Sequence, residues 1–505
     1  MITGVPQTLQ PLLADLVLCA GILALVVCAQ VVSLRARSAD VALLVFAATA
    51  VASVASMDAQ PGWAVPRMLV VDPFGSFFQF TLSMMAMAEV WLAARSRAEP
   101  AGTSRWSATA LAASLLGMFT MVSAANVVTA WLGFEMVSMA WALWIGTQRG
   151  AALAEAAAAL LQAVAASATA LLGFALLYGL TGTLEYAGLG SRLPLALAMP
   201  GGRAVLYTGL VLVLAGFASR IAVVAWQPWR ADLTENAPLA VSAWLETAGT
   251  IAVLAMIARF LRATLVASFA SGYWIALPGI RWPHVISVAA MVTMTMGNLA
   301  AVRADNLRRM IAWLSVAQSG YLMMGLAAAS DRGLEAMLTH GVVYALMLMG
   351  ALACLAPVLE QVGHAGGPDI DVLRGLARRG GSCRMLSAAL VVFFLSLAAV
   401  PPLAGFAGKA RLFTAVFGSN DLLLAAIGGL NSVLGLVCSV RVSAMLFERT
   451  GAEDADPGRR RQRPVELDAD AMLLIALLLA GTIGIGLWPD ALVSFASRSV
   501  AFFGG

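Results

Sequence analysis

The stretch Ser396-Leu-Ala-Ala-Val-Pro-Pro-Leu-Ala-Gly-Phe-Ala-Gly-Lys-Ala-Arg-Leu-Phe413 lies inside a long apolar run and contains adjacent prolines. Proline in a helix interior removes a backbone hydrogen bond and clashes with the preceding turn, so we expect a broken helix here. Lys409 follows the break and is the only lysine of the chain, because the other 30 basic residues are arginines. A charge at a helix centre in a membrane costs roughly 2.5–3.5 kcal/mol even on lenient scales, so Lys409 is a candidate functional residue. Broken helices beside ionisable groups are typical of transporter cores.

The composition is that of a membrane protein. Hydrophobic residues make up 61% of the chain, charged residues 11%, and the mean hydropathy is +0.87. Soluble domains have about twice that share of charged residues. The net charge of +4 is small and spread over the loops, so it indicates membrane topology and not nucleic-acid binding. The five cysteines and three histidines form no CxxC motif or Cys/His cluster, so no metal site or disulfide framework is predicted.

Long apolar runs predict an all-α polytopic membrane protein. A transmembrane helix needs about 20 predominantly apolar residues to cross the hydrocarbon core, and the sequence has about fourteen such runs. Only Ala124–Asn126 separates the fourth run from the fifth. The runs lie near residues 12–33, 41–57, 70–94, 106–125, 126–148, 151–181, 204–225, 237–261, 283–302, 309–329, 334–357, 384–413, 421–446 and 471–494.

The arginines predict which loops face the cytoplasm. Loops after odd-numbered runs hold nineteen arginines, whereas the loops and ends on the other side hold nine, including Arg259 and Arg262. Because cytoplasmic loops carry the excess of positive charge, we expect the odd-numbered loops in the cytoplasm and both termini on the outer side. Arg220 and Arg441 lie within apolar runs. No polar stretch between the runs is long enough for a second domain.

Few ionisable groups remain inside the apolar runs. The charged candidates are Glu135, Arg220, Glu246, Lys409 and Arg441, and weaker polar candidates are Gln162, Gln318, His340, Tyr344 and Asn431. A carboxylate and cations spread over successive helices suit a proton relay, in which the groups face the interior of the bundle. Lysine can release its proton when buried, whereas the guanidinium of arginine stays charged.

Structural interpretations compete with the relay at each position. Glu135 could form an ion pair with Arg220 that only stabilises the bundle, and Lys409 could extend to the membrane surface. Glu246 follows a loop closely and is expected to be half interfacial. Arg441 is expected to be an anchor near the membrane surface, and His340 a packed histidine with its hydrogen bonds satisfied.

A second break predicts an internal repeat. The stretch Ala225–Pro238 interrupts the seventh run after Arg220, as the double proline interrupts the twelfth. Because the two runs are an odd number of helices apart, their orientations in the membrane are opposite, as in an inverted repeat. We expect five-helix repeats at 106–262 (helices 4–8) and 283–446 (helices 9–13), an N-terminal three-helix segment at 1–105, and a C-terminal helix within 471–505.

Several motifs extend over nearly all of the predicted helices. They are Val71-Asp-Pro-Phe74, Trp131-Leu-Gly-Phe-Glu135, Leu176-Leu-Tyr-Gly-Leu-Thr-Gly-Thr-Leu184, Gly297-Asn-Leu-Ala-Ala-Val-Arg303, Ser315-Val-Ala-Gln-Ser-Gly-Tyr321 and Pro401-Pro-Leu-Ala-Gly-Phe-Ala-Gly-Lys409. In this order they resemble the antiporter-like membrane subunits of respiratory complex I, and within them the subunit N group of bacterial NADH-quinone oxidoreductases.

The resemblance implies a proton-translocating subunit in the membrane arm of a complex I-type NADH:quinone oxidoreductase. It implies a long hydrophilic axis with Glu135, Arg220, Gln318 and Lys409 as proton-relay candidates. The partners would be other membrane-arm subunits in a bacterial inner membrane. NADH, flavin, iron–sulfur clusters and quinone would lie on partner subunits, with no redox chemistry and no cofactor in this chain.

The sequence departs from the family at several relay positions. Family lysines on the seventh, eighth and sixth helices correspond here to Arg220, to Gly249–Thr250 and to the alanine run 156–159. The histidine of the tenth-helix motif is Gln318. A different proline breaks the chain after the seventh helix, in the stretch 225–232.

Only Glu135 and Lys409 keep the family's residue type, which leaves two further readings open. The chain could be a non-pumping structural relative that holds its neighbours in the membrane arm. It could also belong to a related cation/proton antiporter, membrane-bound hydrogenase or inorganic-carbon transporter.

Overall fold

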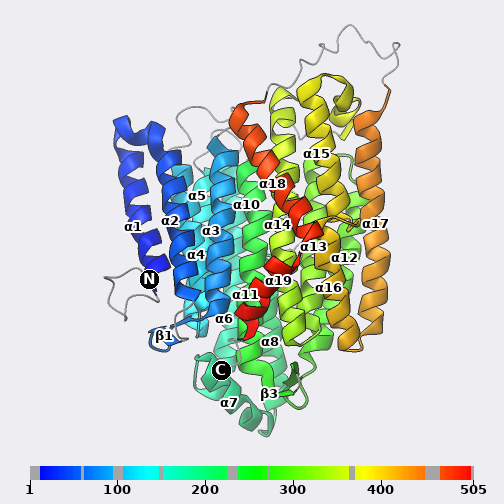
Figure 1. Cartoon of the computed structure of the whole chain (residues 1–505). Coiled ribbons are helices and arrows are strands. Elements are labelled where there is room, and N and C mark those ends of the chain that lie inside the picture. The colour runs from blue at the N-terminus through cyan, green and yellow to red at the C-terminus, as the bar shows by residue number, and fades with distance from the viewer. Residues whose placement is uncertain are drawn as a thin grey trace.

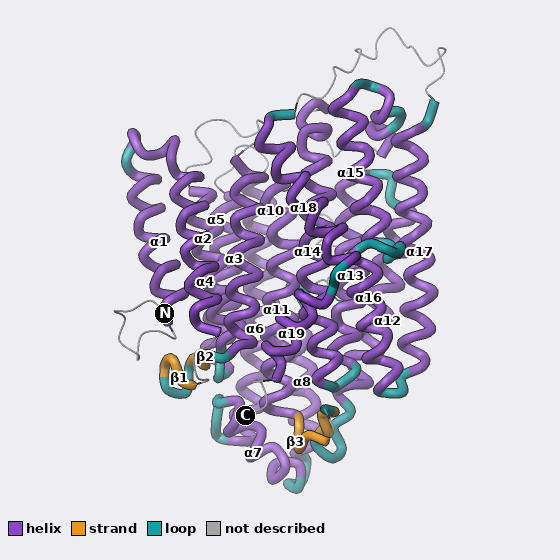
Figure 2. The backbone as a smooth tube through the Cα atoms, in the orientation of Figure 1, coloured by secondary structure: helices purple, strands orange, loops and turns teal. Residues whose placement is uncertain are grey.

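A computed structural model describes residues 12–57, 62–94, 106–146, 152–221, 223, 237, 239–270, 272–362, 370–449 and 467–501. Nearly all of these residues lie in helices that run side by side in one bundle (Figures 1 and 2). The first half contains α1 (Leu13–Gln30), η2 (Val32–Arg37), α2 (Ser38–Met57), α3 (Pro73–Ala94), α4 (Ser107–Ser123), α5 (Val127–Gly146), α6 (Ala152–Thr181), α7 (Tyr186–Leu197), α8 (Gly202–Ala218), α10 (Leu239–Trp244), η4 (Leu245–Gly249) and α11 (Thr250–Leu265). The second half contains α12 (Trp282–Arg303), α13 (Leu307–Ala327), α14 (Asp331–Val362), η5 (Ile370–Leu373), η6 (Leu376–Arg378), α15 (Gly381–Leu397), α16 (Ala404–Gly418), α17 (Leu422–Phe447), α18 (Ala469–Leu487) and α19 (Asp490–Ala501).

Ten helical segments among the described residues are long and apolar enough to cross a membrane. Three shorter apolar helices, α4, α8 and α15, have 17 residues each. The sequence-based number of about fourteen counts apolar runs, and the twelfth run is divided between α15 and α16. The count of fourteen and the inverted repeat therefore remain predictions, whereas the separation of α4 from α5 at Ala124–Asn126 agrees with the sequence.

The two ends of the bundle differ. Two short antiparallel hairpins, β1 (Gly62–Val65) with β2 (Leu69–Val71) and β3 (Val266–Ala270) with β4 (Tyr273–Ala276), lie at one end together with α7 (Figures 1 and 2). The short helical turns η2, η5 and η6 lie at the opposite end. Neither the hairpins nor α7 was expected from the apolar runs, because short surface elements give no such signal.

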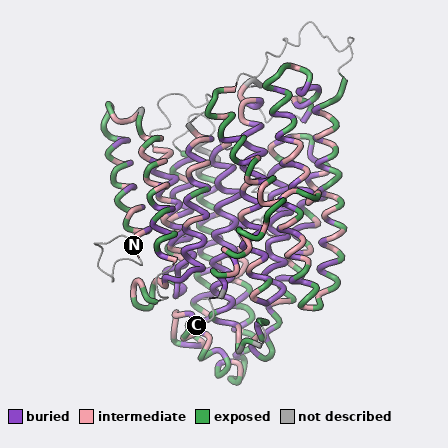
Figure 3. Tube along the Cα trace, viewed as in Figure 1, coloured by how far each residue is buried: buried purple, intermediate pink, exposed green. Residues whose placement is uncertain are grey.

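The helices in the middle of the bundle are buried on all sides. The apolar windows of Leu239–Leu265 and of α13 are wholly buried, whereas only 33% of the window of α1 and 22% of that of α18 are buried (Figure 3). Glycines allow close helix contacts: a Cβ at Gly297 would lie 2.5 Å from the nitrogen of Ala317, and one at Gly216 would lie 2.6 Å from the carbonyl oxygen of Ala166. Packing through small residues is a common way to join helices in membranes.

Two helical segments are irregular at depth. Leu245–Gly249 forms a π-helical turn between α10 and α11. Residues 398–403 separate α15 from α16, as the two prolines predict. A hydrogen bond joins the two helices across the break, because the Ser396 hydroxyl accepts from the backbone N–H of Gly405 at 3.0 Å. The predicted break at 225–238 lies almost entirely outside the described residues.

The C-terminal segment, predicted as one helix, consists of two helices. Pro489 follows α18, and α18 and α19 run obliquely across the bundle (Figure 1). The α18 end packs on the α15–α16 break, because a Cβ at Gly486 would overlap the carbonyl oxygen of Pro402. On α19, the ring of Phe495 lies 4.9 Å from that of Phe77 in α3. This C-terminal pair of helices therefore contacts both halves of the bundle.

Candidate functional site

Lys409 is buried beside the α15–α16 break. Its side chain is 2% exposed, and its Nζ donates a hydrogen bond of 3.0 Å to the carbonyl oxygen of Leu397. The carbonyl is free of the helical ladder because α15 ends at this residue. The Nζ also lies 3.9 Å from the centroid of the Tyr321 ring, a cation–π contact. The expectation that Lys409 extends to the surface is therefore wrong.

Gln318 and His340 are linked to the same carbonyl group of Leu397 by hydrogen bonds. The Nε2 of Gln318 donates to Leu397 O at 3.2 Å, and its Oε1 lies 3.1 Å from Nε2 of His340. The Nδ1 of His340 has no hydrogen-bond partner among the described residues. A Cβ at Gly408 would lie 2.6 Å from this nitrogen, so the glycine next to Lys409 makes room for the imidazole. Lys409, Gln318 and His340 thus form one cluster.

Glu246 is buried completely, so the expectation of a half-interfacial position is wrong. Its Oε2 accepts a short hydrogen bond from the Ser315 hydroxyl, and its backbone carbonyl accepts one from the Tyr344 hydroxyl at 2.6 Å. The two hydroxyl groups lie 2.5 Å apart. Glu246 belongs to the π-helical turn Leu245–Gly249. Single π-helical turns within α-helices are frequent at functional sites.

One face of α13 connects the two groups of residues. Ser315, Gln318 and Tyr321 recur every three residues, so they lie along one side of the helix. On α14, His340 and Tyr344 are four residues apart and face the same region through the contacts above. Beyond Tyr321, the polar contacts continue to Ser432 at 3.1 Å. The spacing on α13 was visible in the sequence, but its partners come from η4, α14 and α16 and had no local signal.

A further pair of amides lies between α12 and α17. Asn431 donates to Thr295 at 2.9 Å, and Asn298 donates to Asn431 at 3.3 Å. By contrast, the Nε2 of Gln162 on α6 is buried without a hydrogen-bond partner among the described residues. Of the weaker polar candidates, Asn431 therefore joins the second half of the chain, whereas Gln162 stays apart from it.

Glu135 and Arg220 have separate surroundings. Arg220 is buried, donates a short hydrogen bond to the Ser138 hydroxyl, and lies over the rings of Phe134 at 5.1 Å and Trp141 at 4.8 Å. These three residues share one face of α5. No ion pair between Glu135 and Arg220 occurs among the described contacts, and Glu135 Oε1 is buried without a hydrogen-bond partner.

Glu135 lies close to the outer surface of the bundle. Three residues before it and four residues after it on α5 are Leu132 and Met139, which are 47% and 62% exposed. The Glu135 carboxylate therefore lies beside an exposed face of α5.

A buried ion pair joins α11 to the start of α3. Arg259 binds Asp72 through two bonds of 2.7 and 2.8 Å and donates to the carbonyl oxygen of Val122 at 2.7 Å. The assignment of Arg259 and Arg262 to a loop is wrong, because both are buried within α11. Arg262 lies 3.6 Å from Asp331 at the start of α14. Hydropathy alone does not indicate that charged residues near a helix end are buried. Asp72, however, belongs to the Val71–Phe74 motif found in the sequence.

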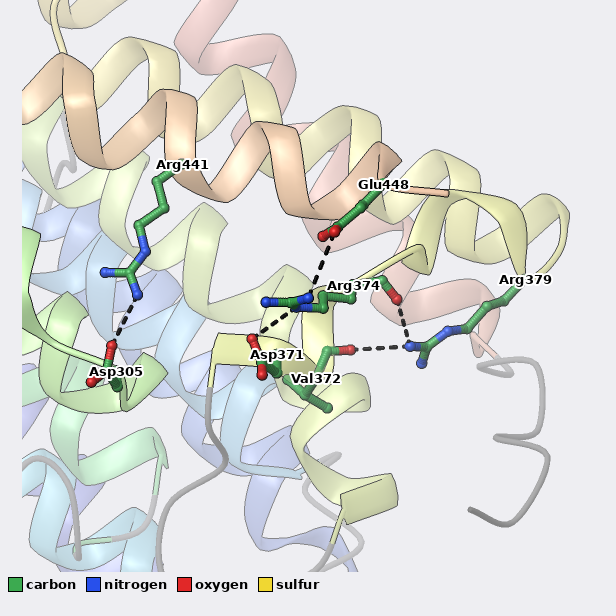
Figure 4. Close-up of polar contacts among 7 residues, drawn as sticks. All are labelled: Asp305, Asp371, Val372, Arg374, Arg379, Arg441 and Glu448. Atoms are coloured by element: carbon green, nitrogen blue, oxygen red, sulfur yellow. Dashed lines mark hydrogen bonds and ion pairs between the residues drawn. The ribbon is translucent and has the colours of Figure 1, made fainter. Parts of the chain in front are cut away.

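Ionic contacts at the η5–η6 end of the bundle hold loops in place (Figure 4). Arg441 donates to the carbonyl oxygens of Val302 and Ala304 and binds Asp305 at 3.0 Å, so it caps the end of α12 near the surface as expected. Arg374 contacts Asp371 at 2.9 Å and Glu448 at 3.6 Å. These arginines make their contacts at the surface and do not contact the cluster of Lys409, Gln318 and His340.

The described residues contain no group of three or more His, Cys, Asp or Glu side chains that could hold a metal ion. The cluster of Lys409, Gln318 and His340 instead offers ammonium, amide and imidazole groups, and the neighbouring group of Glu246, Ser315 and Tyr344 offers a carboxylate and two hydroxyls. Such groups can bind and pass protons, because each can exchange a hydrogen-bonded proton with a neighbour or a water molecule.

Comparison with known proteins gives consistent results. Residues 124–435 match the family described as NADH:quinone oxidoreductase/Mrp antiporter, TM. The NADH-quinone oxidoreductase subunit N of Anaeromyxobacter sp. (strain Fw109-5) is 33% identical over 492 residues, 93% of each chain. The protein of the same name from Desulforamulus reducens is 28% identical over 446 residues, 88% of this chain and 87% of that one.

Solved structures share the fold. A chain of respiratory complex I from Thermus thermophilus with bound Aureothin has a TM-score of 0.75 at 21% identity, covering 95% of this chain and 98% of that chain. A chain of the Mrp complex from Dietzia sp. DQ12-45-1b has a TM-score of 0.79 at 18% identity, covering 98% and 97%.

Proposed function

Because the chain belongs to the family of transmembrane subunits of NADH:quinone oxidoreductases and Mrp antiporters, we propose that it moves protons within the membrane arm of a complex I-type NADH:quinone oxidoreductase. Its partners are other membrane-arm subunits, which surround it in the bilayer. NADH, flavin, iron–sulfur clusters and quinone are bound by partner subunits. This chain contributes proton movement and no redox step.

The observation that carries the proposal is the cluster around Leu397 O. The only lysine of the chain and Gln318 donate to one carbonyl group, and His340 contacts the same glutamine. Lysine exchanges its proton more readily than arginine when buried. The broken helix supplies the carbonyl acceptor, and the covering helices keep its backbone away from lipid. Lys409 is therefore the proton-exchanging group, and Gln318 and His340 are its hydrogen-bonded neighbours.

Glu246, Ser315 and Tyr344 form the second station of the relay. They contact α13 one turn away from Gln318, so the two stations share one helix. Proton transfer between them needs water or side-chain rotation, as in other intramembrane relays. Glu135, near the exposed face of α5, is the group through which a neighbouring subunit connects to the first half, and Arg220 is a fixed charge that orients α5.

The repeats and the topology follow the sequence analysis. The five-helix units are 106–262 and 283–446, and they are inverted with respect to each other. The segments 1–105 and 471–505 flank the repeats. The end of the bundle with η2, η5 and η6 faces the cytoplasm of a bacterial cell, which leaves both termini on the outer side. Reporter fusions at the loop 448–468 and at the C-terminus test this orientation.

Substitution of Lys409 tests the proposed function. Lys409→Ala removes the proton-exchanging group, and Lys409→Arg keeps a charge that cannot be released. In the assembled complex in proteoliposomes, we expect both variants to lower the number of protons moved per electron pair by the whole share of this chain. The control is Thr414→Ala on the exposed face of α16, whose hydroxyl bonds only its own helix. Normal translocation in an intact Lys409→Ala complex would exclude the relay.

A further inference from the structure

Glu89 of α3 is a buried carboxyl group outside the relay described above. The side chain is fully buried, and neither of its oxygens has a hydrogen-bond partner among the described residues. It belongs to the buried stripe of α3 that also contains Leu82, Met85 and Ala86. An ionised carboxylate without a partner in such surroundings costs several kcal/mol. A residue of this kind within a membrane helix is a functional candidate by default.

The helices around Glu89 place it near the Glu246 station. Glu89 stands five residues before the end of α3, and Trp244 stands five residues after the start of α10. With a rise of about 1.5 Å per residue, each lies about 8 Å along its own helix from that helix end. The Trp244 indole donates to Ser114 of α4 at 2.7 Å, so Trp244 of α10 and Ser114 of α4 lie at the same level of the bundle. Glu246 lies two residues past Trp244, about 3 Å deeper.

Contacts between helices support this neighbourhood. α3 packs against both α4 and α10, and α10 leads directly into the π-helical turn that carries Glu246. Thr109, two residues after the start of α4, is also buried, and its Oγ1 has no hydrogen-bond partner among the described residues. Thr109 and Glu89 therefore lie on helices that pack against each other, and Glu246 lies on the turn that follows α10, a helix that also packs against α3.

We propose that Glu89 is a further proton-binding site, which passes protons from the end of the bundle between α3 and α4 to Glu246. The inference rests on the proposed function of the chain. The ligand is a proton and not a metal ion, because a cation such as Mg²⁺ or Ca²⁺ requires several oxygen ligands. The described residues around Glu89 offer no such group. Water entering beside Thr109 completes the path from the surface.

Two substitutions separate a proton-binding role from a structural one. Glu89→Gln keeps the size of the side chain and removes the exchangeable carboxyl group, and Glu89→Leu removes the polar group altogether. Replacing an unpaired buried polar group by an apolar one is tolerated or stabilising. We therefore expect both complexes to assemble and both to lose most of the proton translocation of this chain. The matched control is Ser83→Ala on the same helix, a buried hydroxyl that bonds only Gln79 O.

The measurements are protons moved per electron pair in proteoliposomes and the infrared difference spectrum of the complex on reduction. We expect a signal from a protonated carboxyl group that is lost in Glu89→Gln and retained in Ser83→Ala. An assembled Glu89 variant with normal translocation overturns the inference. Failure of both Glu89 variants to assemble, with Ser83→Ala intact, also overturns it, because it assigns Glu89 a structural role.

Lys409→Ala is measured in the same series. If it lowers translocation while the Glu89 variants do not, only the assignment of Glu89 fails. If Lys409→Ala and the Glu89 variants all leave translocation unchanged, the proposed function fails as well.

Discussion

The two halves of the chain use their buried cations differently. In the second half, Lys409 shares the carbonyl oxygen of Leu397 with Gln318, which contacts His340. In the first half, Arg220 lies over two aromatic rings of α5 and donates to Ser138, while Glu135 stands apart. A lysine can take part in proton exchange and an arginine cannot. In the proposed function, the second half therefore carries the proton-exchanging cation, and the first half a permanent charge.

The position of Glu246 refines this comparison. It lies in the first half of the chain, but its side chain bonds Ser315 of the second half. The one carboxylate of the first half that joins the polar cluster does so by contacting helices of the other half. We infer that proton movement in this chain depends on the contact between the halves, and the three substitutions that follow test that contact in order of decreasing effect.

Glu246→Gln should have the largest effect. The amide keeps the size of the side chain and a hydrogen bond to Ser315 but cannot exchange a proton as a carboxyl group does. Positioned proton-transfer groups contribute roughly 10²-fold or more to rates, so we expect most of the proton translocation to be lost. The measurement is the proton-to-electron ratio in proteoliposomes. Ser319→Ala, a buried hydroxyl of α13 that bonds its own helix, serves as control and should leave the ratio unchanged. Normal translocation by Glu246→Gln would show that proton movement does not depend on this contact between the two halves.

Gly486→Val should have an intermediate effect. Its side chain would push against Pro402 and Ala404 in the α15–α16 break, and overpacking of this kind costs about 1–3 kcal/mol. Leu397 O and Lys409 flank the break, so we expect a lower proton-to-electron ratio at a normal content of complex. Gly484→Val is the matched control on the same helix, because a Cβ there meets nothing within 4 Å. Equal effects of the two valine substitutions would show that the contact of α18 with the α15–α16 break does not position Lys409.

Arg220→Lys should have the smallest effect. The ammonium group keeps the charge but loses the planar contact with the aromatic rings, worth about 0.5–2 kcal/mol. We expect a modest loss of thermal stability of the complex and an unchanged proton-to-electron ratio. A clear gain in translocation would mean that the first half lacks only a lysine, and the contrast between the halves would then come from this one residue.

The sequence predicted the break beside Lys409 and its burial, because two prolines in an apolar run have few alternatives in a membrane. It also predicted the role of Arg441 at the surface. It placed Glu246 too near the surface, since distance from a loop along the chain says little about depth once a helix is covered on all sides. Glu89 did give a signal, because it is a carboxylate deep within the apolar run 70–94, but it belongs to none of the motifs that carry the resemblance.

Other features had no local signal. The sharing of Leu397 O by Lys409 and Gln318 joins residues 91 positions apart in the sequence, and the Asp72–Arg259 pair joins residues 187 apart. The oblique path of α18 and α19 depends on the shape of the surface beneath them. Apolar periodicity reports burial of a single helix and not the identity of its neighbours.

The crossing of α18 and α19 over the bundle has a consequence for biosynthesis. Residues 469–501 leave the ribosome after both repeats, yet Gly486 covers the break beside Lys409 and Phe495 packs on Phe77 of α3. A chain interrupted before these residues has its lysine next to an uncovered break, with backbone groups open to water or lipid. Only completion of the chain therefore covers the break beside Lys409.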